Sequence, residues 1–111
     1  MRIKNNTKKT AVAEDIIYAR SEKDRLLGLT QYTTPRAMMF KTRWGIHTFG
    51  MRFPIDVIVC DATLRVRAIR KNLTPNHIFF WNPRWGYVLE LPQGTIQKSE
   101  VECGDLLVRE E

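Results

Sequence analysis

The segment from Ile55 to Cys60 is the feature that most constrains the fold, because it reads as a β-strand that is apolar on both faces. Alternate residues of a strand point to opposite faces, and here each face carries mostly apolar side chains. Pro54 directly before the segment cannot donate to a sheet ladder and favours an extended backbone in the preceding residue. The strand is therefore expected to begin beside Pro54. Asp56 is the one charged residue in it.

The other apolar segments predict a mainly β domain. Alternation, or β-branched and aromatic content, predicts further strands at 10–19, 36–40, 64–71, 87–91 and 105–109, with a turn or bulge at Glu14 and Asp15. Ser21 offers an N-cap and Gly28 a C-cap for a short helix at 22–27, while 94–99 is a loop or one helical turn. We expect a small antiparallel β sandwich or barrel-like domain of about six or seven strands with one or two short helices.

The length of 111 residues fits one compact domain, so we expect residues 1–111 to form a single domain. The polar and basic residues 1–9 predict a ragged start or an edge strand. No apolar run approaches the roughly 20 residues that span a bilayer, and no apolar signal segment follows the basic start. We expect a cytoplasmic protein that does not bind membranes.

The two cysteines, Cys60 and Cys103, lack the close spacing of a zinc site. They are expected to be reduced thiols, with a disulfide between them as the alternative. Nothing in the sequence indicates a metal or a cofactor.

The net charge of +6 is distributed unevenly. No acid occurs between Asp24 and Asp56, or between Asp61 and Glu90, although both intervals contain several lysines and arginines. A polarised basic surface attracts anions such as nucleic acid, phosphate metabolites or acidic lipid. The same charges are also typical of a solvated face that only keeps a domain soluble.

Two segments predict a ligand-binding cleft. Residues 47–52 combine a histidine, a glycine, a methionine and an arginine, and residues 72–86 form a long loop rich in aromatic side chains. Connections this long in a small domain are usually functional or cover the core as a lid. We expect a cleft near residues 47–52 and 76–86 for a small anionic ligand, with these ligand-binding residues: Arg25, His47, Met51, Arg52, Trp81 and Trp85.

Two other functions remain open. Three tryptophans in predicted loops lie among arginines, a combination that suits single-stranded nucleic acid because bases stack on aromatic rings. These residues are Trp44, Trp81 and Trp85, with Arg43, Arg52 and Arg84. A hydrolase-like enzyme would use His47 and Asp56 as a proton-transfer pair, whereas a histidine bonded to a backbone carbonyl is the simpler interpretation. No nucleophile accompanies the pair, since Cys60 lies in an apolar strand without a nearby cation. We therefore favour a binding domain over an enzyme.

The acids Asp56 and Glu90 each interrupt an apolar strand, and a half-buried carboxylate needs a partner. We expect a structural ion pair of these acids with Arg25 or Arg52, which would lock the helix to the sheet. The alternative places both carboxylates in one cleft that binds a divalent cation or a basic ligand.

Several motifs in order resemble an uncharacterised family known as domain of unknown function 192. The resemblance runs from the first predicted strand to the end of the chain and rests on the segments 25–29, 39–40, 47–57, 88–92 with Gly94, and 104–105. Thr30 departs from the family, which has methionine at that place. The resemblance implies a small, mainly β sandwich or barrel-like fold and no particular reaction, because the family has no established activity.

Overall fold

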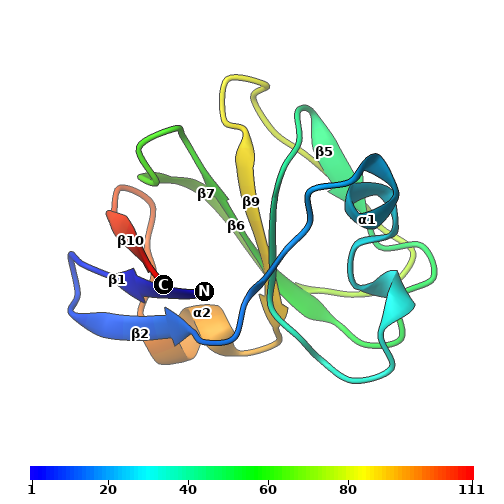
Figure 1. The fold of residues 1–111 in the computed structure, drawn as a ribbon, viewed down its shortest axis with the longest axis horizontal. Coiled ribbons are helices and arrows are strands. Elements are labelled where there is room, and N and C mark those ends of the chain that lie inside the picture. Colours follow the sequence, from blue (N-terminus) through cyan, green and yellow to red (C-terminus); the bar gives the residue numbers. More distant parts are fainter.

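The computed structural model describes residues 1–111 and confirms the mainly β fold. Ten strands form three sheets, and two short α-helices and one 3-10 helix connect them (Figure 1). More strands form than the six or seven expected, for two reasons. The segment 10–19 divides at Asp15, where φ is +53°, and short strands form within segments read as loops.

The largest sheet has five strands, and the rest of the chain packs against its two faces. It is open, with β3 and β7 at its edges, and every neighbouring pair is antiparallel except β3 with β4. In spatial order its strands are β3 (Ile17–Tyr18), β4 (Met38–Lys41), β9 (Tyr87–Pro92), β6 (Ile55–Cys60) and β7 (Val66–Leu73).

A three-stranded sheet and a two-stranded ribbon complete the fold. The first has the order β10 (Leu107–Glu110), β1 (Arg2–Asn5) and β2 (Thr10–Ala13), and the ribbon pairs β5 (Gly45–His47) with β8 (Ile78–Phe80). Of the two expectations for residues 1–9, a ragged start or an edge strand, a strand does form, but its edge position is wrong: β1 is the central strand of its sheet and buries Ile3 and Asn5. The three-stranded sheet and the ribbon lie toward opposite ends of the molecule (Figure 1).

Local signals set the predicted helix. α1 spans Glu22–Leu27, as the sequence predicts, and the Asp24 backbone N–H donates to the Ser21 hydroxyl at 3.0 Å. Gly28 ends the helix with a φ of +52° and begins the 3-10 helix η1 (Gly28–Gln31). The second helix, α2 (Thr95–Ser99), forms where a loop or one helical turn was expected.

Two hydrophobic cores lie on the two faces of the five-stranded sheet, which explains why β6 is apolar on both sides. All six residues of β6 are buried. Ile58 and Cys60 pack with β1, β2, β10 and α2, whereas Ile55, Val57 and Val59 pack with η1, Met51 and Trp81. Burial on both faces makes β6 a central structural strand.

Asp56 holds three elements together through backbone hydrogen bonds. Its Oδ1 accepts from the Asn72 N–H at 3.1 Å and its Oδ2 accepts from the Ile96 N–H at 2.9 Å. The predicted ion pair of Asp56 with Arg25 or Arg52 is wrong, since none of the six ion pairs involves these residues. The two amides satisfy the buried carboxylate at the end of β7 and the start of α2, where no arginine side chain is needed.

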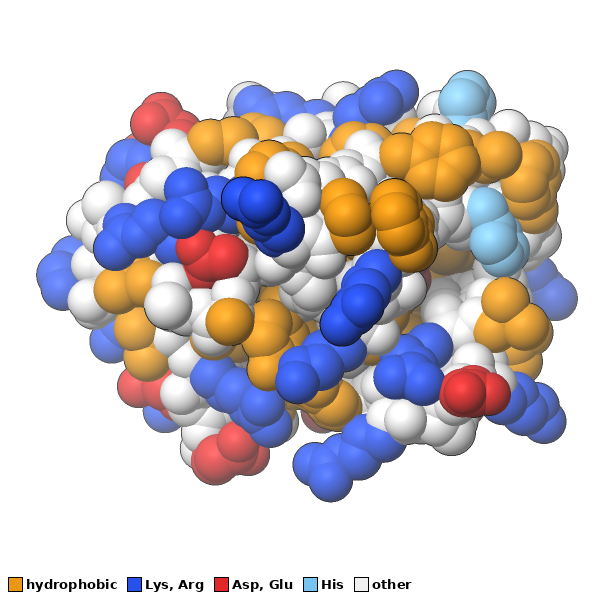
Figure 2. Space-filling view, turned by 90° about the horizontal axis from the view of Figure 1, so that it is seen from above, with side chains coloured by type: hydrophobic (Ala, Val, Ile, Leu, Met, Phe, Trp, Pro, Cys, Tyr) orange, Lys and Arg blue, Asp and Glu red, His pale blue; other side chains and the backbone are white.

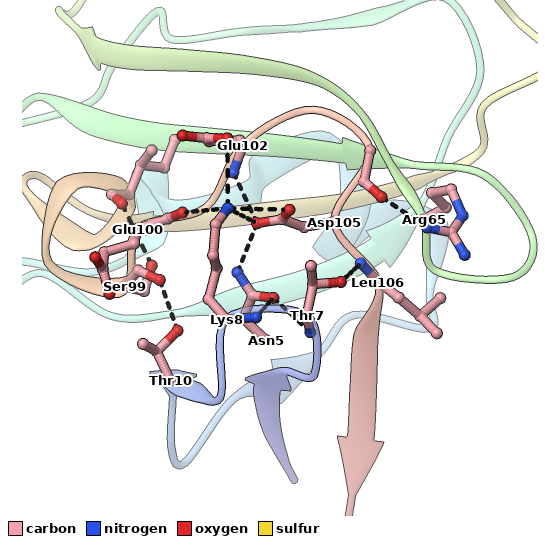
Figure 3. Close-up of polar contacts among 12 residues, drawn as sticks. Asn5, Thr7, Lys8, Thr10, Arg65, Ser99, Glu100, Glu102, Asp105 and Leu106 are labelled. Carbon is pink, nitrogen blue, oxygen red and sulfur yellow. Dashed lines mark hydrogen bonds and ion pairs between the residues drawn. The ribbon is translucent and has the colours of Figure 1, made fainter.

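A second polar network closes the three-stranded sheet around Asp105 (Figure 3). The carboxylate of Asp105 accepts hydrogen bonds from Lys8 Nζ and Asn5 Nδ2, each at 2.8 Å, and from the Glu102 N–H at 3.1 Å. Burial alone would raise the pKa of Asp105, but the hydrogen bonds from Lys8 and Asn5 hold it below its usual value. The network joins the turn after β1 to the turn before β10.

Both cysteines are free thiols, and only Cys60 is buried. Burial, with a smaller contribution from the Asp61 charge, raises the pKa of the Cys60 thiol to about 12, so the thiol stays protonated at neutral pH. None of the helices is long and apolar enough to span a bilayer.

Candidate functional site

One cavity of about 670 Å³ opens beside α1, within the size range of sites that hold small molecules. Its walls come from α1 and Gly28, from the end of β4 with the turn that follows, from β5, and from residues 83, 84, 86 and 87. Glu90 of β9 also lines it. The cavity therefore lies where α1, the ribbon and the five-stranded sheet meet.

Four cationic side chains line this cavity: Arg25, Lys41, Arg43 and Arg84. None of them forms an ion pair with an acid, and the lining contains only two acids, Glu22 and Glu90. Lys41 instead places its ammonium group 5.0 Å from the centre of the Tyr87 ring. Figure 2 shows lysine and arginine side chains gathered on one face among exposed apolar ones. This excess of positive charge favours anions in the cavity.

Glu90 is the buried acid of the site. The residue is 2% exposed, and its Oε1 has no hydrogen-bond partner. Burial raises the pKa of Glu90 to about 7, although a hydrogen bond from the Leu29 backbone lowers it in part. Gly28 lies against the carboxyl group, since a Cβ at that position would stand 2.9 Å from Oε1. Glu90 thus lines a ligand-sized space, and one of its carboxyl oxygens is buried against Gly28 without a hydrogen-bond partner from the protein.

His47 contributes a second buried atom without a partner, its Nδ1. The ring comes from β5 and lines the cavity, and it stacks on Phe49 with the ring centres 5.5 Å apart. The simpler interpretation from sequence, a histidine bonded to a backbone carbonyl, does not hold for Nδ1. Nδ1 is buried and has no hydrogen-bond partner from the protein, although the residue lines the cavity.

The rim beside β5 carries exposed aromatic side chains. Trp44 is 65% exposed and Phe80, whose ring lies next to Gly45, is 69% exposed. Trp44 adopts a φ of +76°, which is unusual for a bulky residue and occurs where surrounding structure holds the backbone in place. The cavity is therefore bordered by an apolar surface as well as by cations.

The structure brings together two of the six predicted ligand-binding residues, Arg25 and His47, in the cavity lining. Their role in binding stays a prediction. Met51 and Trp81 belong to the hydrophobic core, and the Trp81 indole N–H donates to the Trp85 carbonyl at 2.9 Å. The prediction that Trp81 faces a ligand is wrong, because its indole is buried in the hydrophobic core and does not line the cavity. Neither Arg52 nor Trp85 lines the cavity.

The register of β6 against β9 separates Asp56 from the cavity. Glu90 lies opposite Val57, and Asp56 lies opposite Leu91. Directly opposed residues share a face, so Glu90 points to the side of Val57 and Asp56 to the other side. The predictions of one cleft for Asp56 and Glu90, and of a His47 and Asp56 proton-transfer pair, are therefore wrong. Arg25 does line the cavity with Glu90 but forms no ion pair with it.

Several cavity residues were not named as ligand-binding residues from the sequence, among them Lys41, Arg43 and Tyr87. The absence of acids between Asp24 and Asp56 was the signal for Lys41 and Arg43. It did not show that these side chains line one cavity with Arg25. No group of three or more histidine, cysteine or acidic residues is arranged to hold a metal ion.

Comparison with known proteins places the chain in a family. The model of domain of unknown function 192 (DUF192), described as "Uncharacterized ACR", matches residues 2–108. The chain belongs to this family. The match extends from β1 into β10, so the DUF192 fold includes all three sheets. No curated protein matches the chain.

Two crystal structures share the fold of this DUF192 member. A protein of unknown function from Novosphingobium aromaticivorans DSM 12444 superimposes with a TM-score of 0.75 at 20% identity, covering 85% of this chain and 74% of that one. A proposed transcription regulator from Sinorhizobium meliloti 1021 superimposes with a TM-score of 0.77 at 23% identity, covering 96% of this chain and 89% of that one. At these identities the likeness establishes the fold alone.

Proposed function

We propose that this DUF192 domain binds a small anionic molecule, such as a phosphate monoester, in the cavity beside α1. The observation that carries the proposal is the set of four cations around one cavity, none of which has an acid as an ion-pair partner. Arginine presents a planar fork of donors that matches carboxylate and phosphate oxygens. Arg25 is half-buried in the wall formed by α1, so its charge is less screened by water than that of a free surface arginine.

Calorimetric titration with propyl phosphate tests the proposal. We expect the variant Arg25→Ala with Arg84→Ala to bind at least about tenfold more weakly than the wild type, since it loses two charge-assisted contacts. Lys71→Ala with Arg109→Ala is the matched control, because it also removes two exposed cations and neither residue lines the cavity. An equal loss in this control would show that only net charge attracts the anion and would refute a site in the cavity.

Single-stranded nucleic acid is the second candidate, and the exposed aromatic rim favours it. Trp44 and Phe80 are available for stacking beside the cavity, unlike the buried Trp81. The Sinorhizobium meliloti protein, described as a proposed transcription regulator, adds a reason to test it. A labelled oligonucleotide should bind with an affinity that falls steeply with salt and drops in Trp44→Ala. No binding at low salt would exclude this candidate.

A further inference from the structure

The cavity carries two buried polar atoms without a hydrogen-bond partner, on the same lining as the cations. One is Oε1 of Glu90, in β9, and the other is Nδ1 of His47, in β5. A buried polar atom without a partner is unfavourable unless a ligand satisfies it. Binding of an anion by the arginines alone would leave both atoms without a hydrogen-bond partner.

We infer that the cavity selects, among small anions, those that also carry uncharged hydroxyl groups, as a hydroxylated phosphate monoester does. The inference rests on the anion site proposed above. It adds which protein atoms bind the uncharged end of the ligand. The anionic end pairs with Arg25 and Arg84. One hydroxyl donates to Oε1 of Glu90, and a second bonds to Nδ1 of His47.

The surroundings of Glu90 make its free oxygen an acceptor for a small group. The Leu29 backbone N–H supports the ionised carboxylate, which has acceptor oxygens only. Gly28 has no side chain, and a Cβ there would crowd Oε1 at 2.9 Å. The absence of a side chain at position 28 leaves room beside the carboxyl group, so a small shift of the Glu90 side chain would let a hydroxyl of the ligand donate to Oε1.

The positive charge of the cavity favours a ligand whose hydrogen-bond donor is uncharged. An ammonium group would also donate to Glu90, but it would enter a cavity that already holds the positive charges of Arg25, Lys41, Arg43 and Arg84. Like charges in a partly desolvated site repel one another. A hydroxyl donates without adding charge, so the cavity favours hydroxylated anions over zwitterions.

Two matched probes test this selection. Glycerol 3-phosphate and propyl phosphate share the carbon chain and the phosphate, and only the first has hydroxyl groups. Calorimetry at pH 8, where Glu90 is ionised, should show that the wild type binds glycerol 3-phosphate about tenfold more tightly, as a hydrogen bond to a charged group provides. In Glu90→Met, which keeps the side-chain length without an acceptor oxygen, the preference should fall to less than about threefold.

A measurement on the wild type alone covers the case in which Glu90→Met does not fold. The Leu29 backbone N–H lowers the pKa of the Glu90 carboxyl group, so the two groups interact, and the NMR shift of the Leu29 amide proton should move more with glycerol 3-phosphate than with propyl phosphate. Equal affinities and equal Leu29 shifts, with binding still dependent on Arg25 and Arg84, would overturn the inference and keep the anion site. A preference undiminished in Glu90→Met would also overturn it. Absence of binding by both phosphates would refute the anion site and this inference together.

Discussion

Gly28 lies directly against the carboxyl group of Glu90, so that a Cβ at position 28 would stand 2.9 Å from Oε1. The glycine ends α1, and the acid lies in the middle of β9. The end of the helix thus packs closely on the sheet, and both residues line the cavity. A residue that a sequence shows as a helix cap also shapes the candidate site.

Gly28→Ala should destabilise the fold by about 2 kcal/mol, because the added Cβ crowds a buried carboxyl group and the φ of +52° disfavours any side chain. Urea unfolding at pH 7 measures the change. Gly94→Ala is the matched control, since Gly94 also has a positive φ, of +91°, but nothing within 4 Å of an added Cβ. We expect the control to lose about 1 kcal/mol from backbone strain alone. Equal losses in the two variants would show that the contact with Glu90 has no energetic weight.

The ionisation of Glu90 should make stability depend on pH in the neutral range. Burial raises the pKa of Glu90 from 4.5 to about 7 in the folded protein. Between these values the native state holds a proton that the unfolded chain has released, so the free energy of unfolding falls as pH rises and levels off above about 7. The full loss is about 3 kcal/mol for a shift of this size.

Glu90→Gln removes this titration while keeping the shape of the side chain. The difference in unfolding free energy between wild type and Glu90→Gln should therefore change in favour of the variant from pH 4.5 to pH 7. Urea unfolding of both proteins across this range provides the measurement. A difference that stays constant with pH would show that Glu90 ionises normally in the folded protein.

Asp56→Ala should destabilise the fold by about 3 kcal/mol, because it leaves the backbone N–H groups of Asn72 and Ile96 without their charged acceptor. Asp56→Asn retains one acceptor oxygen and should lose roughly half as much. Thermal and urea unfolding of the two variants test the ranking. An unchanged melting temperature in Asp56→Ala would mean that water satisfies both amides and that this carboxylate is not a structural centre.

Local signals made part of this fold predictable from sequence. Ser21 and Gly28 mark both ends of α1, and Pro54 marks the start of β6, because caps and proline act on the nearest backbone. The central position of β1 was missed because its pairing with β10 joins the two ends of the chain, and polar residues there gave no local sign of burial. Pairing over that distance depends on tertiary packing.

The candidate site was predictable only in outline. Arg25 and His47 were named from sequence, but the side of the sheet that an acid faces depends on strand register. The register of β6 with β9 sends Glu90 into the cavity and Asp56 away from it, although both appeared as equivalent acids in apolar strands. Trp81 appeared as a loop residue, and only packing shows that it belongs to the core.

The Asp105 network should govern stability in acid. Because hydrogen bonds from Lys8 and Asn5 hold the pKa of Asp105 below the ordinary 3.8, the unfolded chain takes up a proton before the folded protein does. The free energy of unfolding should then be highest above pH 3.8 and fall as pH drops through the lowered value.

Asp105→Asn removes this titration and should make the free energy of unfolding depend less on pH in acid than it does in the wild type. Acid unfolding followed by circular dichroism tests this, with Glu111→Gln as a control that removes an exposed carboxyl from the C-terminus. Parallel acid limbs for wild type and Asp105→Asn would show that the Lys8 and Asn5 hydrogen bonds do not favour the ionised form.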